Sequence, residues 1–142
     1  MFNNKDVFIY FGATKIVNLI FLSKYIMRKI AIICGGYSGE YEISIKSAKV
    51  VKKHLDSSIY DSYIIVIQKG DWYHLTDDDK HIPVDKNDFS INIDGKKITF
   101  DAVFNAVHGI PGENGEILGY FEMLNIPYTS SNFTTCALTF NK

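Results

Sequence analysis

Two stretches of this 142-residue chain place a glycine-rich turn directly after an apolar run and before a helical pattern. The first consists of the apolar residues 30–34 and the turn 35–40, and the second of residues 102–107, which are apolar except for Asn105, and the turn 108–115. A continuous apolar run bounded by glycine is typical of a central parallel strand that is covered on both faces. Strands that alternate with helices through short turns predict a doubly wound α/β sheet.

The remaining segments supply the other elements of this fold. Residues 42–55 have helical spacing, residues 60–68 are rich in β-branched and aromatic side chains, and residues 71–75 complete a hairpin. The polar residues 76–97 are predicted to be a loop or a weakly ordered insertion, because a proline, a glycine and an acidic run break any period. After a strand within residues 98–107, we expect a helix at 113–124, a short strand at 126–129, and a final helix that Asn132 caps.

Composition limits the kinds of partner that this chain can have. Apolar residues make up 46 % of the chain and charged residues 22 %, which is typical of a folded, soluble domain. Fifteen basic residues against sixteen acidic ones give a net charge of -1, so the chain lacks the electrostatic signature of a nucleic-acid or membrane-surface protein. The predicted partner is therefore a small molecule, with no nucleic acid and no membrane.

The first 26 residues are set apart from the predicted domain. Residues 7–13 and 16–22 are apolar, but Lys15 and Asn18 interrupt them, so no run reaches the length of a membrane span. A signal peptide is an alternative, although no clear small-residue cleavage site precedes Arg28. We expect residues 1–26 to be an extension that is not native or is loosely docked, and residues 27–142 to be the domain.

The spacing of the two cysteines matches no metal-binding or disulfide motif. Cys34 ends an apolar run and Cys136 lies in the final helix, without CxxC spacing or a cysteine–histidine cluster. Both are predicted to be buried, reduced thiols. The acidic run 77–79 is predicted to be solvated surface, so no metal site is expected.

Glu40 and His108 are the candidates for chemistry, because each lies in one of the two glycine turns. Turns that follow parallel strands gather at one edge of the sheet, so the two side chains are predicted to share a crevice. The Glu40 carboxylate suits an ammonium group, and the His108 imidazole can donate to a carboxylate or phosphate oxygen. The alternatives are structural: Glu40 only complements the helix dipole, and His108 is a lone structural histidine. The other histidines, His54, His74 and His81, are predicted to be surface residues.

A nucleotide-binding or dinucleotide-binding Rossmann domain is the competing interpretation of the first turn. The strand, glycine turn and helix favour it, and amides near a helix N-terminus welcome an anion. However, the glycine spacing is G-G-x-x-G instead of G-x-G-x-x-G, and only Asp56 and Asp61 loosely match the expected acidic residue. The negative charge of Glu40 would also repel a pyrophosphate.

Taken in order from residue 29 to residue 142, these motifs resemble the N-terminal domain of D-alanine:D-alanine ligase, a bacterial cell-wall enzyme of the ATP-grasp superfamily. Two glycine motifs and an Ile-Pro-Tyr-Thr element, highly specific in combination, carry the resemblance, together with Ala137, Leu138 and Lys142: Gly35-Gly36-x-Ser38-x-Glu40, Phe104-Asn105-x-x-His108-Gly109-x-x-Gly112-Glu113-x-Gly115 and Ile126-Pro127-Tyr128-Thr129. The resemblance implies a Rossmann-like (pre-ATP-grasp) α/β domain with a mainly parallel sheet and helices on both faces.

The resemblance also implies a function and a set of site residues. The family joins two D-alanines in the cytoplasm for peptidoglycan synthesis, through an acyl phosphate made from ATP. By resemblance, Glu40 holds the ammonium group of the first D-alanine, Ile43 lies against its methyl group, and His108, followed by Gly109, lies near the reacting carboxylate. Lys142 is the weak candidate for binding the nucleotide. A homodimer is also implied.

The chain departs from the family pattern at three places. Tyr41 stands where the family often has histidine or arginine, and Asn141 stands where it often has aspartate. The third departure is length, because the family's ATP-grasp domains, which bind most of the ATP and the magnesium, have no counterpart here. We therefore expect the isolated chain to be inactive; a non-catalytic ligase fragment remains an alternative.

Overall fold

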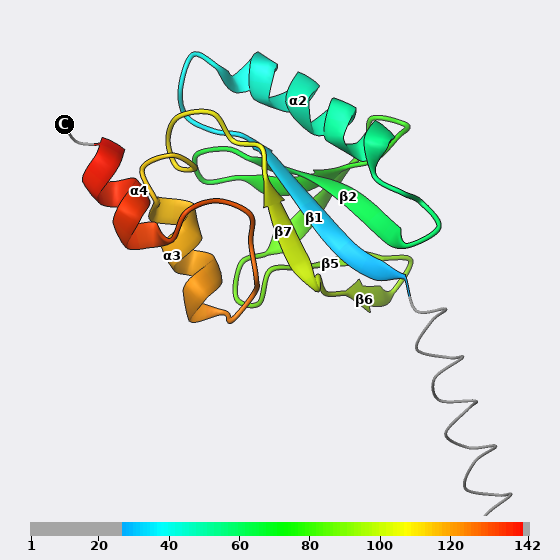
Figure 1. Ribbon diagram of the computed structural model, residues 1–142. Helices are drawn as coiled ribbons and strands as arrows, with labels where there is room; N and C mark the ends of the chain where they lie inside the picture. Colours follow the sequence, from blue (N-terminus) through cyan, green and yellow to red (C-terminus); the bar gives the residue numbers. More distant parts are fainter. Residues whose placement is uncertain (1–26, 141–142) are drawn as a thin grey trace, which may run out of the picture.

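The structure is a computed structural model that describes residues 27–140, and Figure 1 shows its arrangement. Seven strands form one sheet and three helices accompany it. The strands are β1 (Arg28–Gly35), β2 (Tyr60–Ile67), β3 (Trp72–Leu75), β4 (His81–Asp85), β5 (Ser90–Ile93), β6 (Lys96–Ile98) and β7 (Ala102–Asn105). The helices are α2 (Tyr41–His54), α3 (Glu116–Met123) and α4 (Phe133–Phe140). None of these helices is long and apolar enough to cross a membrane.

The sheet is mixed, which corrects the prediction of a mainly parallel one. Its order is β6-β5-β4-β3-β2-β1-β7, and only the pairs β1–β2 and β1–β7 are parallel. The four other pairs are antiparallel. Strands β2 to β6 follow one another through short turns, and short turns can join only antiparallel neighbours.

Residues 76–97 are ordered, so the prediction of a loop or weakly ordered insertion was wrong. They contain β4, β5 and nearly all of β6, which extend the hairpin of β2 and β3. The strands are short, but each buries at least one apolar side chain: Val84, Ile91 and Ile98 are at most 8 % exposed. Burial of these side chains outweighs the polar composition of the segment.

Two clusters of apolar side chains form the core on the two sides of β1. Alternate residues of β1 separate between them: Ala31 and Ile33 belong to the first cluster, and Ile32 and Cys34 to the second. The first cluster also takes side chains from β4, β5 and β6 and from α3, because the sheet curls (Figure 1). The second takes Ala48 of α2. The curled strands β4 to β6 thus cover part of the first cluster, which in a flat sheet would have to be covered by helices.

The elements after β7 extend the parallel part of the sheet. Tyr128 forms a parallel bridge with Val103 of β7, at the position of the predicted short strand 126–129. The final helix begins as predicted, because the Asn132 side chain accepts a hydrogen bond of 2.8 Å from the backbone amide of Thr135. Residues 1–26, predicted to be an extension, lie outside the described residues.

Candidate functional site

The two glycine turns lie side by side at the carboxyl edge of β1 and β7, as predicted. The amide of Tyr37 donates to the carbonyl oxygen of Ile110 over 2.8 Å. Gly36 has φ of +102°, and a Cβ atom there would lie 2.8 Å from the Ile110 oxygen. Because β1 and β7 are parallel neighbours, their following turns meet, and only glycine allows the approach seen at residue 36.

Glu40 is the residue that immediately precedes α2, and its side chain is exposed. Its backbone amide donates to Oγ of Ser38 over 3.3 Å, and that hydroxyl donates to the carbonyl oxygen of His108 over 3.0 Å. A Cβ atom on Gly109 would lie 3.7 Å from the Glu40 carboxylate oxygen Oε2. Ser38 therefore links Glu40 to the turn that carries His108 and Gly109.

His108 is held at its ring as well as at its carbonyl group. Its Nε2 atom lies 3.3 Å from Oγ of Ser47, a half-buried residue of α2. Within residues 27–140, no protein group forms a hydrogen bond with Nδ1 of this ring. The half-buried His108 lines a cavity of about 370 Å³, whose other walls include Asn105, Ala106, Val107, Gly112, Glu113, Ser130, Ser131 and Cys136.

Ser44 fixes α2 against both strands that lead into the site. Its hydroxyl is fully buried, donates to the carbonyl oxygen of Ala106 over 2.7 Å, and accepts from the amide of Gly35 over 2.8 Å. Sequence reasoning gave no role to the hydroxyl groups of Ser38, Ser44 or Ser47. The signal available was the i, i+3 spacing of Ser44 and Ser47, which puts both hydroxyls on one face of the helix.

The structure describes two of the three remaining predicted site residues. Ile43 lies on α2 and is 55 % exposed, so it is free to contact a ligand. Gly109 is buried, and a Cβ atom there would lie 2.9 Å from Oγ of Ser38. Lys142 lies outside the described residues.

Tyr41, the residue that departs from the family pattern, joins a network of hydroxyl groups next to Glu40. Nε2 of Gln68 donates to its hydroxyl over 2.7 Å, and the hydroxyl oxygens of Tyr41 and Tyr73 are 3.4 Å apart. Burial raises the pKa of Tyr73 well above its ordinary value. The network connects the start of α2 to the hairpin of β2 and β3.

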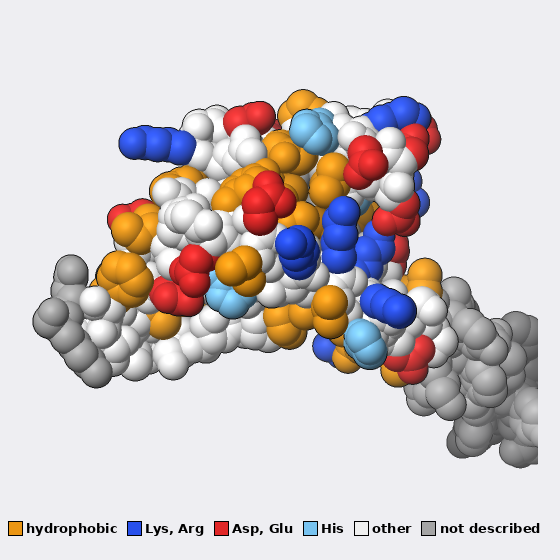
Figure 2. All heavy atoms as spheres, turned by 90° about the horizontal axis from the view of Figure 1, so that it is seen from above, with side chains coloured by type: hydrophobic (Ala, Val, Ile, Leu, Met, Phe, Trp, Pro, Cys, Tyr) orange, Lys and Arg blue, Asp and Glu red, His pale blue; other side chains and the backbone are white. Residues whose placement is uncertain are grey.

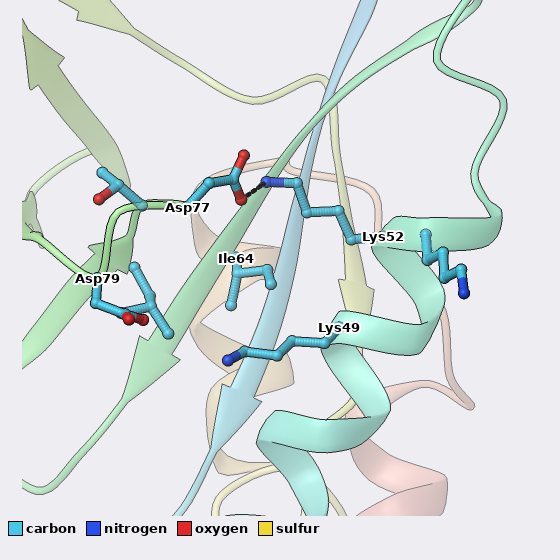
Figure 3. Close-up of a pocket in the computed structure, with 8 residues that line it drawn as sticks. Lys49, Lys52, Ile64, Asp77 and Asp79 are labelled. Carbon is cyan, nitrogen blue, oxygen red and sulfur yellow. Dashed lines mark hydrogen bonds and ion pairs between the residues drawn. The ribbon is translucent and has the colours of Figure 1, made fainter.

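A cavity of about 440 Å³ lies elsewhere, between α2 and the turn after β3 (Figure 3). Lys49 and Lys52 extend from α2 on either side of Ile64, and Lys52 pairs with Asp77 over 2.6 Å. Figure 2, which looks down on the molecule from above, shows lysine side chains gathered on this face. None of the residues lining it belongs to either glycine turn. It therefore forms no part of the candidate site, although it is larger than the cavity beside His108.

Two predictions about single residues need correction. His74, predicted to lie at the surface, is 6 % exposed, and its Nδ1 atom is 2.9 Å from the carbonyl oxygen of Ile64. Burial lowers the pKa of this imidazole. Cys34 is fully buried as predicted, but Cys136 is only half-buried; both thiols are free. Within residues 27–140, no group of three or more potential metal ligands is found.

Comparison with known proteins places this geometry in a family. Residues 29–131 match the family described as "D-ala D-ala ligase N-terminus". The chain is 50 % identical over 115 residues to D-alanine--D-alanine ligase of Christiangramia forsetii, covering 81 % of this chain and 35 % of that protein. It is 49 % identical over 116 residues to the ligase of Flavobacterium johnsoniae, covering 82 % and 36 %. The chain thus spans about a third of the length of these relatives.

Solved structures give the same assignment. D-alanyl-alanine synthetase A of Vibrio cholerae matches with a TM-score of 0.70 and 30 % identity, over 82 % of this chain and 34 % of that one. VanG D-Ala:D-Ser ligase of Enterococcus faecalis matches with the same TM-score and identity, over 82 % and 39 %. The ligase of Bacillus anthracis, solved in complex with ATP, matches with a TM-score of 0.61 and 26 % identity, over 82 % and 32 %. The curled, mixed sheet with three helices is the N-terminal fold of these enzymes, and this chain belongs to the D-alanine:D-alanine ligase family.

Proposed function

We propose that this chain is the N-terminal, substrate-binding part of an ATP-dependent D-alanine:D-alanine ligase, and that it contributes the site for the first D-alanine. The observation that carries this proposal is the pairing of the two turns through Ser38, which puts Glu40 and His108 at one edge of the sheet. Residues 27–142 form the domain, and cytoplasmic peptidoglycan synthesis is the proposed setting. The assignment to a Rossmann-like class with helices on both faces belongs to this proposal, and it is supported by the packing of α2 and α3 in different core clusters.

The chemistry of the two side chains matches the two ends of an amino acid. The Glu40 carboxylate is exposed and can accept charge-assisted hydrogen bonds from an ammonium group. The free nitrogen of His108 can donate to a carboxylate and stabilise the charge that develops there during phosphoryl transfer. Ile43, on the first turn of α2, supplies an exposed apolar surface for the methyl group. Gly109 keeps the backbone beside His108 free of a side chain.

ATP and magnesium are assigned to other parts of the enzyme. Within the described residues, no group of three or more His, Cys, Asp or Glu side chains is arranged to hold a metal ion. Lys142 is proposed as a nucleotide contact on the family resemblance. A homodimer is proposed on the same ground. The relatives extend well beyond the segment that this chain matches, and we therefore propose that the isolated chain binds D-alanine without ligating it.

The test of the proposed function compares Glu40→Gln with Glu42→Gln, since both glutamates are exposed and stand two residues apart at the start of α2. We expect Glu40→Gln to weaken D-alanine binding about tenfold or more, because the ammonium group of the ligand loses its charged acceptor. Glu42→Gln should leave the affinity unchanged. NMR titration of the labelled chain with D-alanine measures both. Equal affinities for the two variants would contradict the role of Glu40.

The same NMR titration, with NAD in place of D-alanine, tests the dinucleotide-binding alternative. Titration with NAD should leave the amide signals of the turn 35–40 unchanged, because Glu40 repels a pyrophosphate there. Saturable shifts in this turn with NAD, and none with D-alanine, would replace the proposed function by a dinucleotide-binding one.

A further inference from the structure

His108 is held by two serines that flank Glu40 in the sequence. Ser38 donates to its carbonyl oxygen over 3.0 Å, and Oγ of Ser47 lies 3.3 Å from its Nε2 atom. The two contacts fix the residue at its backbone and at its ring. A histidine that only filled space would need neither contact.

The register of α2 against the segment after β7 explains why Ser47 meets the ring. Ser44 lies one helical turn before Ser47 and donates to the carbonyl oxygen of Ala106 over 2.7 Å. Ala106 lies two residues before His108, so one turn of α2 matches two residues of the facing segment. Since Ser44 is fully buried and also accepts from the Gly35 amide, this register is well fixed.

The position of the ring proton decides whether Nδ1 of His108 is a hydrogen-bond donor or an acceptor for a ligand. A neutral imidazole has one N–H donor and one acceptor nitrogen, and the hydrogen bond at one nitrogen sets the state of the other. Among residues 27–140, Nε2 of His108 is the sole hydrogen-bond partner of the Ser47 hydroxyl. When this hydroxyl donates to a protein group, that nitrogen is its acceptor. The ring proton then resides on Nδ1, the nitrogen that no protein group occupies.

We propose that Ser47 is a positioning residue, which donates to Nε2 of His108 and keeps the neutral ring in the Nδ1–H form that can donate to the carboxylate of the first D-alanine. This inference rests on the proposed function for the identity of the ligand. It explains why α2 carries a second serine on the face that meets the glycine turn. A carboxylate can only accept hydrogen bonds, so the opposite tautomer would present it with a lone pair.

The test measures the tautomer directly, apart from any activity. Long-range ¹H–¹⁵N correlation spectra of the ¹⁵N-histidine chain are recorded at a pH of about 8.5, where imidazoles are ordinarily neutral. His108→Gln identifies the signals of His108 among the four histidines. The native chain should show a protonated Nδ1, Ser47→Ala should move the population towards Nε2–H, and Ser47→Thr should restore the native pattern.

Ser57→Ala is the matched control, because Ser57 is exposed, follows α2 and forms no hydrogen bond within the described residues. It should leave the spectrum unchanged. Ser47→Ala should also weaken D-alanine about fivefold, the order of one neutral hydrogen bond, and Ser57→Ala should not. A native Nε2–H ring, or a tautomer that Ser47→Ala leaves unchanged, would overturn the proposal for Ser47 even if D-alanine binds. An Nδ1–H ring that depends on Ser47 in a chain that does not bind D-alanine would support the Ser47 contact and overturn the proposed function.

Discussion

At the scale of single residues, Gly36 is a position where the two turns leave no room for a side chain. A Cβ atom there would lie 2.8 Å from the Ile110 oxygen and 3.0 Å from Cγ1 of Val107, whereas nothing lies within 4 Å of a Cβ atom at Gly39. We expect Gly36→Ala to lower the free energy of unfolding by about 2 kcal/mol, because it combines this collision with an unfavourable φ. Gly39→Ala should change it by less than about 0.5 kcal/mol. Urea denaturation measures both, and equal stabilities of the two variants would show that the turns do not touch.

The two thiols should differ in reactivity. Burial raises the pKa of Cys34 from an ordinary value of 9.0 to about 12, with a small opposing effect of Lys49, while Cys136 is half-buried. At pH 8, Ellman's reagent should label Cys136 promptly and Cys34 only on unfolding, and Cys136→Ser should remove the fast phase. A fast phase that survives Cys136→Ser would contradict the burial of Cys34.

The shift of Cys34 also has a consequence for stability at high pH. The protonated thiol is favoured in the folded state, so its contribution is fully present below pH 9, where the unfolded thiol is protonated too. It is lost as the pH rises towards about 12. Cys34→Ala should therefore make the loss of stability across this alkaline range less steep.

At the scale of elements, α2 depends on one buried hydroxyl for its position. Ser44→Ala would leave the Gly35 amide without its acceptor and remove a donor from the Ala106 carbonyl. We expect a loss of about 1–3 kcal/mol in the free energy of unfolding, the cost of buried polar groups left unsatisfied. Ser57→Ala should cost almost nothing. Thermal and urea unfolding measure the difference, and a Ser44→Ala variant as stable as the control would contradict this account of α2.

The elements also show what the sequence can predict. The strands that precede the two turns were predictable because residues 30–34 are a continuous apolar run and residues 102–107 are apolar except for Asn105. The topology rule for parallel strands then predicted that Glu40 and His108 lie at one edge. Strands β4 to β6 were not predictable, because three to five residues with a proline and several charges give no period. The roles of Ser38 and Ser47 depend on which carbonyl and which ring face them, and neither a serine in a turn nor the i, i+3 spacing on α2 identifies those partners.

At the scale of the whole molecule, the curl of the sheet gives its two faces different surroundings. The first core cluster is enclosed by the strands and by α3, while α2 brings its serines to the edge where the two turns meet. The site residues therefore rest on α2, β1 and β7, the parallel part of the sheet. The antiparallel strands β3 to β6 complete the core, and the lysine-lined cavity beside β3 lies apart from the turns. Ligand binding is thus expected at the edge of the parallel strands.

The central claim is that one amino acid lies between Glu40 and His108, and intermolecular nuclear Overhauser effects test it most directly. The chain is saturated with ¹³C-labelled D-alanine, and isotope-filtered spectra record which protons of the protein lie near the ligand. We expect the ligand methyl group to contact Ile43 and its α proton to contact the His108 ring in the same complex. Contacts with one turn only, or with Ile64 and Leu75 in the lysine-lined cavity, would contradict the shared site.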